Sequence, residues 1–199
     1  NAHIARNMEM VHATVNHPSV VIWSLGNEAG PGDNFKECYR AIKDYDTSRP
    51  VQYERNNDIV DMGSNQYPSI AWVQGAVKGT YKLKYPFHIS EYAHSMGNAC
   101  GNLIDYWNAI ESTNFFMGGA IWDWVDQALD KRDPTTGKTY WAYGGDFGAD
   151  NKPNDGMFCM NGILRPDFTP KAQYFEVKKV YQNVSVKAVD MKKGLVEIF

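Results

Sequence analysis

The chain has 199 residues with a formal net charge of −3, and 43% of its residues are hydrophobic and 14% aromatic. This composition predicts a globular domain with a sizeable core. Lys and Arg are scattered rather than clustered, and no apolar run approaches the roughly 20 residues of a membrane-spanning helix. We therefore expect neither nucleic acid nor a membrane among the partners.

The three cysteines, Cys38, Cys100 and Cys159, are odd in number and lack the paired spacing of a metal site. This pattern favours free thiols and a reducing compartment, so we expect a cytoplasmic protein. The chain begins at Asn1 without an initiating Met. We therefore expect an internal piece of a longer protein. Because the true N-terminus would then lie elsewhere, a periplasmic location is the alternative to the cytoplasm.

The first elements in chain order are a helix, a strand and a second helix. Apolar residues at helical spacing predict a helix from Ile4 to Val15, which Asn16–Pro18 ends. The uninterrupted apolar run Val20–Trp23 is typical of a strand buried on both faces of a parallel sheet. Asp33 is then predicted to cap a helix whose apolar side holds Phe35, Cys38, Tyr39, Ile42 and Tyr45.

Four more strands follow, with helices between some of them. They are predicted at Val51–Glu54, from Ile59–Met62 towards Tyr67, at Phe87–Ser90 and at Gly118–Trp122, with a helix from Leu103 to Ile110. Such alternation indicates a parallel sheet with its functional groups at the carboxyl ends of the strands. Because a closed (β/α)8 barrel needs more strands, the sheet is either open and doubly wound or a barrel without its first three strands.

The last third of the chain has a different character. Residues 130–170 are rich in Gly, Pro, Asn and Asp and poor in periodicity, which predicts a functional loop. A helix around Tyr174–Tyr181 follows, and then two alternating segments, Val184–Ala188 and Leu195–Phe199, predict a hairpin. We interpret residues 1–182 as one domain and residues 183–199 as the start of a following β domain.

Two carboxylates follow predicted strands, Glu28 after Val20–Trp23 and Glu91 after Phe87–Ser90. A glycoside hydrolase of the usual kind needs two carboxyl groups that flank one glycosidic bond. Each signal alone is weak, because a carboxylate beside a glycine turn is often only a cap. Tyr92 and His94 flank Glu91 and favour an ordered polar cleft, with a buried, internally satisfied Glu91 as the alternative.

Other residues in the last third of the chain narrow the class of site. Asp123 and Asp126 are candidate metal ligands. Carboxylates in a segment such as Trp-Asp-Trp-Val-Asp are, however, more commonly hydrogen-bonded struts. Neither a phosphate-binding glycine loop nor a nucleophile elbow is present, which disfavours nucleotide binding and a serine hydrolase. Six aromatic residues would by default fill a core, but an aromatic-rich loop beside two carboxylates fits a carbohydrate cleft better, because sugar rings stack on exposed indoles: Trp122, Trp124, Trp141, Tyr143, Phe147 and Phe158.

Four segments together closely resemble the bacterial β-galactosidases of glycoside hydrolase family 2. They are His17–Glu28, Ser90–Asn98, Gly118–Gln127 and Phe158–Gly162, and the likeness runs in the same order from about Arg6 to Tyr181. The resemblance implies an α/β fold, a (β/α)8 TIM barrel that is incomplete in this chain. Strands four to eight would lie here, followed by the start of a β-sandwich domain, while the first three strands and the N-terminal sandwich domains lie outside it.

The resemblance also implies roles for individual residues. Glu28 corresponds to the general acid/base, and Glu91 to the nucleophile that forms a covalent galactosyl intermediate. In such retaining enzymes the two carboxyl groups lie about 5 to 5.5 Å apart. Asn27 would bind the sugar 2-hydroxyl and Tyr67 would orient Glu91. The galactose pocket would be lined by His94, Trp122 and Asn161, with Trp122 under the ring.

The family also implies two metal ions. Mg²⁺ would lie beside the acid/base, and of its ligands only Glu28 is in this chain. Na⁺ would bind the Phe158 carbonyl and the Asn161 side chain, together with an Asp from another domain. One departure from the family pattern is Gln66 before Tyr67, where β-galactosidases often carry Met, which affects the local packing.

The sequence thus predicts the C-terminal part of the catalytic barrel of a retaining enzyme that cleaves terminal β-D-galactosides of the lactose type. It would act with the remaining domains of a homo-oligomeric enzyme. We expect the isolated chain to be inactive and poorly soluble, because half a barrel leaves open strand edges. The alternatives are a family 2 β-glucuronidase or β-mannosidase, or a non-catalytic carbohydrate-binding fragment.

Overall fold

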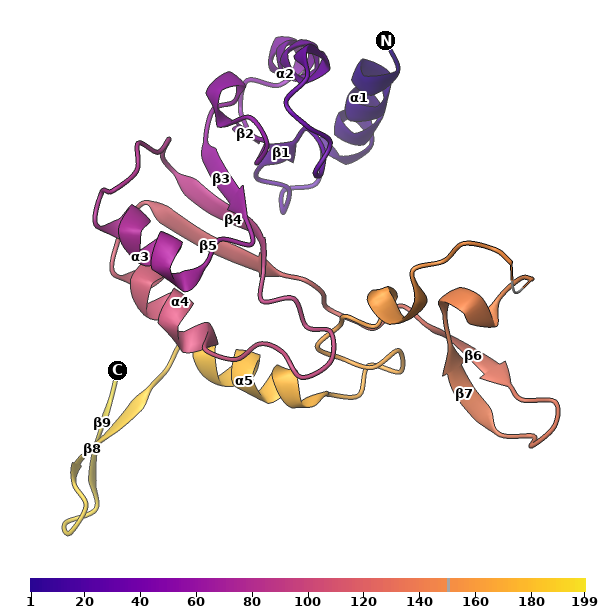
Figure 1. Cartoon of the computed structure of the whole chain (residues 1–199). Helices are drawn as coiled ribbons and strands as arrows, with labels where there is room; N and C mark the ends of the chain where they lie inside the picture. The colour runs from indigo at the N-terminus through magenta and orange to yellow at the C-terminus, as the bar shows by residue number, and fades with distance from the viewer. Residues whose placement is uncertain (150) are drawn as a thin grey trace. The chain divides into compact units, whose positions relative to one another are not determined.

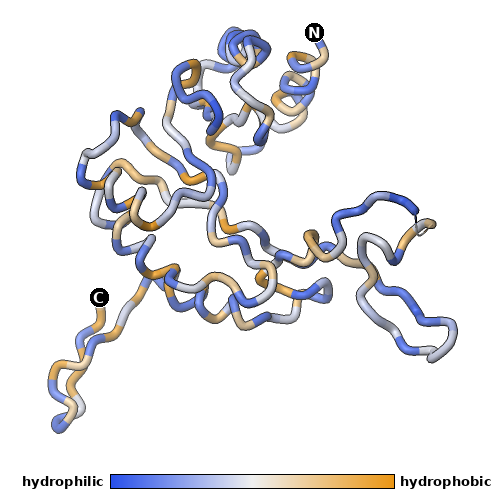
Figure 2. Tube along the Cα trace, viewed as in Figure 1, coloured by the Kyte–Doolittle hydropathy of each residue, from blue (hydrophilic) through white to orange (hydrophobic). Residues whose placement is uncertain are grey.

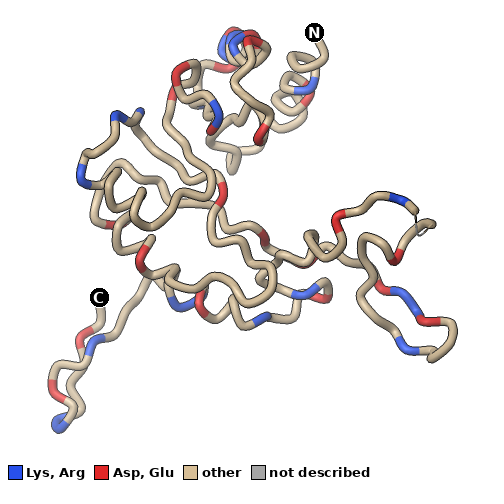
Figure 3. The backbone as a smooth tube through the Cα atoms, in the orientation of Figure 1, with Lys and Arg blue, Asp and Glu red and all other residues tan. Residues whose placement is uncertain are grey.

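The computed structural model describes residues 1–149 and 151–199, which form two compact units. The first unit comprises residues 1–92 and 105–120, and the second comprises residues 93–104 and 121–199. Charged residues of both signs are interspersed along the trace (Figure 3). No helix in the described residues combines the length and apolar character needed to cross a membrane.

The first unit begins with two helices, α1 (Ala2–Thr14) and α2 (Asp33–Tyr45). α1 ends just before Asn16, as predicted. The prediction that Asp33 caps α2 was wrong, because the extended backbone of Gly32 takes the capping position. Asp33 instead lies in the first turn, where its carboxylate is 2.8 Å from the Lys36 ammonium.

Strand β1 (Trp23–Ser24) pairs in parallel with β2 (Val51–Gln52). The outer face of this pair packs into a hydrophobic core with the two helices, whose buried members are Val11, Trp23, Leu25, Phe35, Cys38, Ile42, Val51, Tyr53 and Val60. Val20–Trp23 was predicted to be buried on both faces, but Val21 is 61% exposed. Of this run only Trp23 lies in β1, and Val21 precedes the strand.

A three-stranded sheet completes the first unit, in the order β3 (Gly63–Gln66), β4 (Phe87–Tyr92) and β5 (Phe116–Ile121). β3 and β4 are parallel. Helices α3 (Ile70–Val77) and α4 (Leu103–Glu111) run along one side of this sheet (Figure 1). The five strands β1 to β5 correspond to the five predicted ones.

Two details in this region differ from the prediction. The third strand begins at Gly63, because residues Asn57–Ile59 form the 3₁₀ helix η1 in place of extended chain. Helix α3 was not predicted, although Ser69 caps it and its Oγ accepts a hydrogen bond from the Trp72 amide at 3.2 Å. Its apolar residues are contiguous rather than spaced at helical intervals, so the periodicity gave no signal.

The second unit contains a hairpin that was predicted as irregular loop. β6 (Leu129–Arg132) and β7 (Thr139–Ala142) are antiparallel. The turn between them closes on the Asp133 carboxylate, which accepts hydrogen bonds from the Thr135 and Thr136 amides at 2.8 and 3.3 Å. Two 3₁₀ helices follow, η2 (Gly144–Asp146) and η3 (Gly156–Cys159). The predicted irregularity therefore holds only for the rest of the stretch.

The second unit ends with helix α5 (Ala172–Val180) and a second hairpin, β8 (Val186–Asp190) with β9 (Leu195–Ile198), both as predicted. Hydrophobic residues lie along both strands of this hairpin (Figure 2). They are exposed, with Val186 at 61% and Ile198 at 68%. That the hairpin starts a β-sandwich domain stays a prediction.

The Asp46 side chain connects α2 with the strand β1 and the end of α1. Its Oδ2 accepts hydrogen bonds from the Trp23 indole at 2.9 Å and from the Arg49 guanidinium at 2.7 Å. Arg49 also donates to the carbonyls of Val20 and Val15, each at 2.7 Å. Because Asp46 is only 7% exposed, this charged cluster is a buried junction of the first unit.

We predict that Asp46→Asn weakens this junction in a pH-dependent way. The Ser48 hydroxyl, with help from Arg49 and Trp23, holds the pKa of Asp46 well below its ordinary value. A carboxyl with a depressed folded-state pKa stabilises the fold above the unfolded pKa, and this contribution is lost as the pH falls. At pH 7 the variant should lose about 2 kcal/mol of the free energy of unfolding of this junction. Amide hydrogen exchange in residues 15–25 should then be at least tenfold faster than in the wild type.

The difference between the variant and the wild type should begin to shrink only below about pH 4, the ordinary range of an unfolded Asp. Asp33→Asn is the matched control, since its side chain is 89% exposed and should contribute little. A difference that stays constant down to pH 2 would contradict the assignment.

Candidate active site

Glu28 lies in a strained turn beyond the carboxyl end of β1. Its φ of 52° is left-handed, a conformation that costs a non-glycine residue about 1–2 kcal/mol. The Glu28 amide donates a hydrogen bond to Glu54 Oε1 at 2.8 Å, and the Glu54 side chain is only 2% exposed. The Arg55 guanidinium lies 3.1 Å from Glu28 Oε1. A buried acceptor thus holds the backbone of this residue, and a cation holds its carboxylate.

Side-chain hydrogen bonds connect the ends of β1 and β3. Gln66, the last residue of β3, donates from Nε2 to Asn27 Oδ1 at 3.0 Å. Gln66 Oε1 in turn accepts from Arg55 at 3.3 Å. The three side chains therefore form a continuous chain of hydrogen bonds that reaches Glu28 through Arg55.

Tyr67 and Glu91 lie at the ends of the next two paired strands. The ladder between β3 and β4 shifts register after Asn65, which places Gln66 opposite Glu91. The Tyr67 amide donates to the Glu91 carbonyl at 2.8 Å. Tyr67, with a φ of 49°, is also left-handed. The first unit thus gathers Asn27, Glu28, Tyr67 and Glu91 at the carboxyl ends of β1, β3 and β4.

The remaining predicted site residues come together in the second unit. The Ser95 amide, next to His94, donates to the Trp122 carbonyl at 2.7 Å, and the His94 and Phe158 ring centroids are 5.4 Å apart. The Asp123 amide donates to the Asn161 carbonyl at 2.7 Å. A cavity of about 290 Å³ is lined by Trp122, Gln127, Gly144, Asp155, Gly156, Phe158, Cys159 and Asn161.

None of the six aromatic residues noted in the sequence is buried, so the default of core packing does not apply to them, and their role in a carbohydrate cleft stays a prediction. Trp124 and Phe158 are both 55% exposed, and Phe147 is 45% exposed. This segment consists of a hairpin and short 3₁₀ turns, which offer few apolar partners within the second unit. The exposed rings of Trp124, Phe147 and Phe158 therefore do not belong to the core of the second unit.

The surroundings of Asn161 and Glu28 show how far the residues of this chain fit the two implied metal sites. Asn161 Oδ1 is buried without a hydrogen-bond partner in the described structure, while its Nδ2 donates to the Phe158 carbonyl at 2.8 Å. Buried carbonyl oxygens of this kind suit a hard cation, so these two residues fit part of a Na⁺ site. Around Glu28, by contrast, the described residues offer no group of three or more His, Cys, Asp or Glu side chains for Mg²⁺.

Asp126 is a structural strut, as the more common alternative predicted. Its Oδ1 is 2.9 Å from the Lys171 ammonium and accepts a hydrogen bond from the Gly162 amide at 2.8 Å. The Leu164 carbonyl accepts from the Asp126 amide at 2.9 Å. This buried pair holds the segment that carries Trp122 against the segment that carries Asn161.

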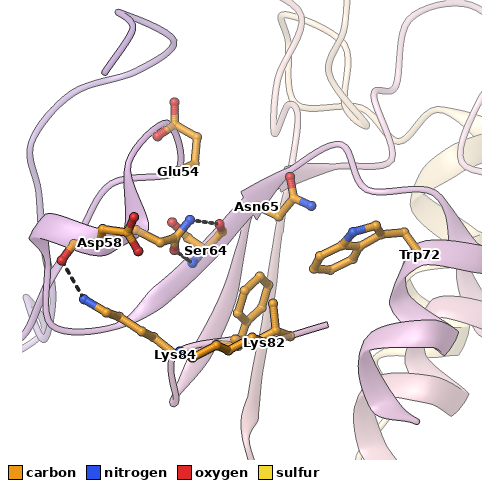
Figure 4. A pocket seen from close by; sticks show the side chains of 10 residues that line it. Glu54, Asp58, Ser64, Asn65, Trp72, Lys82 and Lys84 are labelled. Atoms are coloured by element: carbon orange, nitrogen blue, oxygen red, sulfur yellow. Dashed lines mark hydrogen bonds between the residues drawn. The ribbon is translucent and has the colours of Figure 1, made fainter. Parts of the chain in front are cut away.

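The larger cavity of the first unit was not predicted. It has a volume of about 470 Å³ and is lined by Glu54, Asn57, Asp58, Ser64, Asn65, Trp72, Lys82, Leu83, Lys84 and Phe87 (Figure 4). None of the predicted site residues lines it. Its residues come from separate helices, loops and strands, so no single motif in the sequence marks it.

Sequence reasoning also missed Glu54 and Arg55, which contact Glu28 directly. Glu54 ends the predicted strand Val51–Glu54 and Arg55 follows it, at the same edge of the sheet as Asn27 and Glu28. Their place at the end of that strand was the one available signal.

Comparison with known proteins decides the family. The family model described as "Glycosyl hydrolases family 2, TIM barrel domain" matches residues 1–186. The chain belongs to glycosyl hydrolase family 2. The predicted TIM-barrel class is therefore confirmed at the level of the family 2 domain.

The family 2 relatives include β-galactosidases from several bacteria. The chain is 44% identical to a β-galactosidase of Priestia megaterium over 192 residues, which cover 95% of this chain and 18% of that protein. It is also 44% identical to a β-galactosidase of Vibrio cholerae over 195 residues, covering 92% of this chain and 19% of that protein. The chain thus spans about a fifth of the length of these relatives.

Solved structures of family 2 share the fold. A β-galacturonidase from Eisenbergiella tayi bound to galacturonate aligns with a TM-score of 0.61 at 20% identity, covering 89% of this chain and 36% of that chain. β-Glucuronidase 3 from Bacteroides uniformis aligns with a TM-score of 0.59 at 16% identity, covering 94% of this chain and 28% of that chain. At such low identity the likeness extends to the fold alone.

We predict that Gly162→Ala disrupts the contact between the two segments of the second unit. A Cβ at position 162 would overlap the backbone of Val125 and Asp126, which cannot move without breaking the hydrogen bonds around them. The free energy of unfolding of this contact should fall by about 2 kcal/mol or more, measured as faster amide hydrogen exchange in residues 159–164. Gly101→Ala is the matched control, because a Cβ there meets open space. Equal effects of the two substitutions would refute the overlap.

Proposed function

We propose that the chain is the part of a retaining β-galactosidase that carries both catalytic carboxyl groups. One observation carries the proposal: Gln66 is hydrogen-bonded to Asn27 and Arg55 while it lies opposite Glu91 in the sheet. Residues far apart in sequence thus meet where a TIM barrel places its chemistry. The identities of 44% to β-galactosidases support the choice of substrate class.

In the first half of the proposed reaction, the Glu91 carboxylate attacks the anomeric carbon of the galactoside. The bond from that carbon to the leaving oxygen breaks while Glu28 donates its proton to that oxygen. The products are the free alcohol and a galactosyl ester of Glu91. Tyr67, joined to Glu91 through the backbone, would help to orient the nucleophile.

In the second half, water replaces the alcohol. Glu28, now ionised, removes a proton from water as the water oxygen attacks the anomeric carbon. The ester bond to Glu91 breaks, galactose leaves with retained configuration, and both carboxyl groups return to their starting states. The net reaction is the hydrolysis of one glycosidic bond.

The cavity of the second unit favours a neutral sugar over a uronate. Among its described lining residues are one carboxylate, Asp155, and no Lys or Arg. A uronide carries a carboxylate, which proteins usually bind with a cationic partner. Trp122 and Asn161 in this cavity would instead offer a ring to the apolar face of galactose and an amide to its hydroxyls.

The same proposal includes metal ions and further domains. Asn161 and Phe158 would hold Na⁺, and a cation there would offer coordination positions to sugar hydroxyl oxygens. Glu28 would add one ligand to a Mg²⁺ site completed outside this chain. Residues 183–199, which include the exposed hairpin, would begin the next domain, and the enzyme would assemble as a homo-oligomer.

The nucleophile is tested by trapping the intermediate in the full-length enzyme. A 2-fluoro galactoside with a good leaving group should inactivate the enzyme and add one fluorogalactosyl group to Glu91, found by peptide mass spectrometry. The matched 2-fluoro glucuronide should leave the enzyme unlabelled. Label on another residue would refute the role of Glu91, and labelling by the glucuronide alone would favour the β-glucuronidase alternative.

The acid role of Glu28 is tested with leaving groups of different acidity. Glu28→Gln cannot donate a proton, so lactose hydrolysis should fall by about 10³-fold or more, because general acid catalysis contributes on the order of 10²–10⁴. Formation of the galactosyl intermediate from a dinitrophenyl galactoside should fall far less, since that leaving group needs no proton. Equal losses on both substrates would contradict the assignment.

A further inference from the structure

Arg55 determines which way the amide of Gln66 faces. A guanidinium group has five N–H donors and no acceptor, so the Gln66 atom 3.3 Å from Arg55 must be the oxygen. The alternative amide orientation would place two donors against each other. Arg55 is itself held by Glu28 Oε1 at 3.1 Å and lies 3.7 Å from Glu54 Oε1.

The orientation of Gln66 then determines that of Asn27. With its oxygen towards Arg55, Gln66 presents the Nε2 donor to Asn27, and the Asn27 atom at 3.0 Å must be the acceptor Oδ1. The Nδ2 group of Asn27 is therefore directed away from Gln66. One donor-only side chain thus sets the hydrogen-bond direction of a residue that it does not touch.

This direction suits a particular group on the substrate. Ionised carboxylates, such as that of Glu91 as nucleophile, accept hydrogen bonds and cannot donate them. A sugar hydroxyl next to the reacting carbon that gives its one proton to a carboxylate needs a donor on its oxygen. An Asn27 side chain that presents its amide N–H supplies that donor.

We propose that Arg55 and Gln66 are positioning residues that fix Asn27 as a hydrogen-bond donor to the 2-hydroxyl oxygen of the galactoside. This inference rests on the function proposed above. A Met at position 66, which the resembling enzymes often carry, has no N–H donor and would leave the direction of Asn27 to other contacts. The device therefore depends on Gln66, a position at which this chain departs from the family pattern.

The test compares two substrates in the full-length enzyme, a nitrophenyl β-galactoside and its 2-deoxy counterpart. Gln66→Glu keeps the size of the side chain but offers only acceptors, so Asn27 must turn its N–H group towards it and present oxygen to the sugar. On the parent galactoside kcat/KM should fall about tenfold, the value of one hydrogen bond. On the 2-deoxy substrate, which lacks the contact, it should change less than about threefold.

Two further variants separate the loss of the hydrogen-bond donor from the effect of the added charge. Gln66→Met removes the donor without adding charge and should show the same substrate dependence with a smaller loss. Gln74→Glu, the same exchange at an exposed position on α3, should leave both substrates unaffected. Melting temperatures would verify that each variant is folded.

The outcomes separate this inference from the proposed function. An enzyme that hydrolyses both substrates, but in which the two Gln66 variants lower both rates equally, would overturn the positioning role. A wild-type enzyme without activity on any β-galactoside would refute the proposed function, and with it the sugar contact. A loss confined to the substrate with a 2-hydroxyl would support the inference.

Discussion

The register of β3 against β4 is the constraint on which the candidate site depends. Parallel strands end at one edge, but the shift after Asn65 decides that Gln66, rather than a neighbour, lies opposite Glu91. A slip of one residue would turn every side chain of β3 to the other face of the sheet. Gln66 would then no longer reach Asn27, and the ends of β1 and β3 would lose the side chains that connect them.

Much of the fold follows from patterns that are visible in the sequence. α1 and α2 were predicted because apolar residues at helical spacing, such as Phe35 and Ile42, are buried in the core. The third strand begins at Gly63 rather than at the expected Ile59, because Asn57 forms hydrogen bonds with both the amide and the carbonyl of Ser64, at 2.5 and 3.0 Å, which favour a 3₁₀ turn. Such side-chain contacts to distant backbone are not encoded in the spacing of apolar residues.

Part of the candidate site was likewise predictable from the sequence, and part was not. Glu28 and Glu91 were recognisable because each follows an apolar strand, and the rule about carboxyl ends of parallel strands needs no coordinates. Glu54 and Arg55 were missed, since their importance comes from contacts with Glu28 across the sheet. For the aromatic residues of the second unit the sequence left core packing as the default, because composition does not reveal whether a segment has partners to pack against.

Both catalytic candidates are anchored through their main chains. The Glu28 amide is held by Glu54, and the Glu91 carbonyl accepts from the Tyr67 amide. Shortening either side chain therefore removes a reactive group without releasing the peptide that carries it.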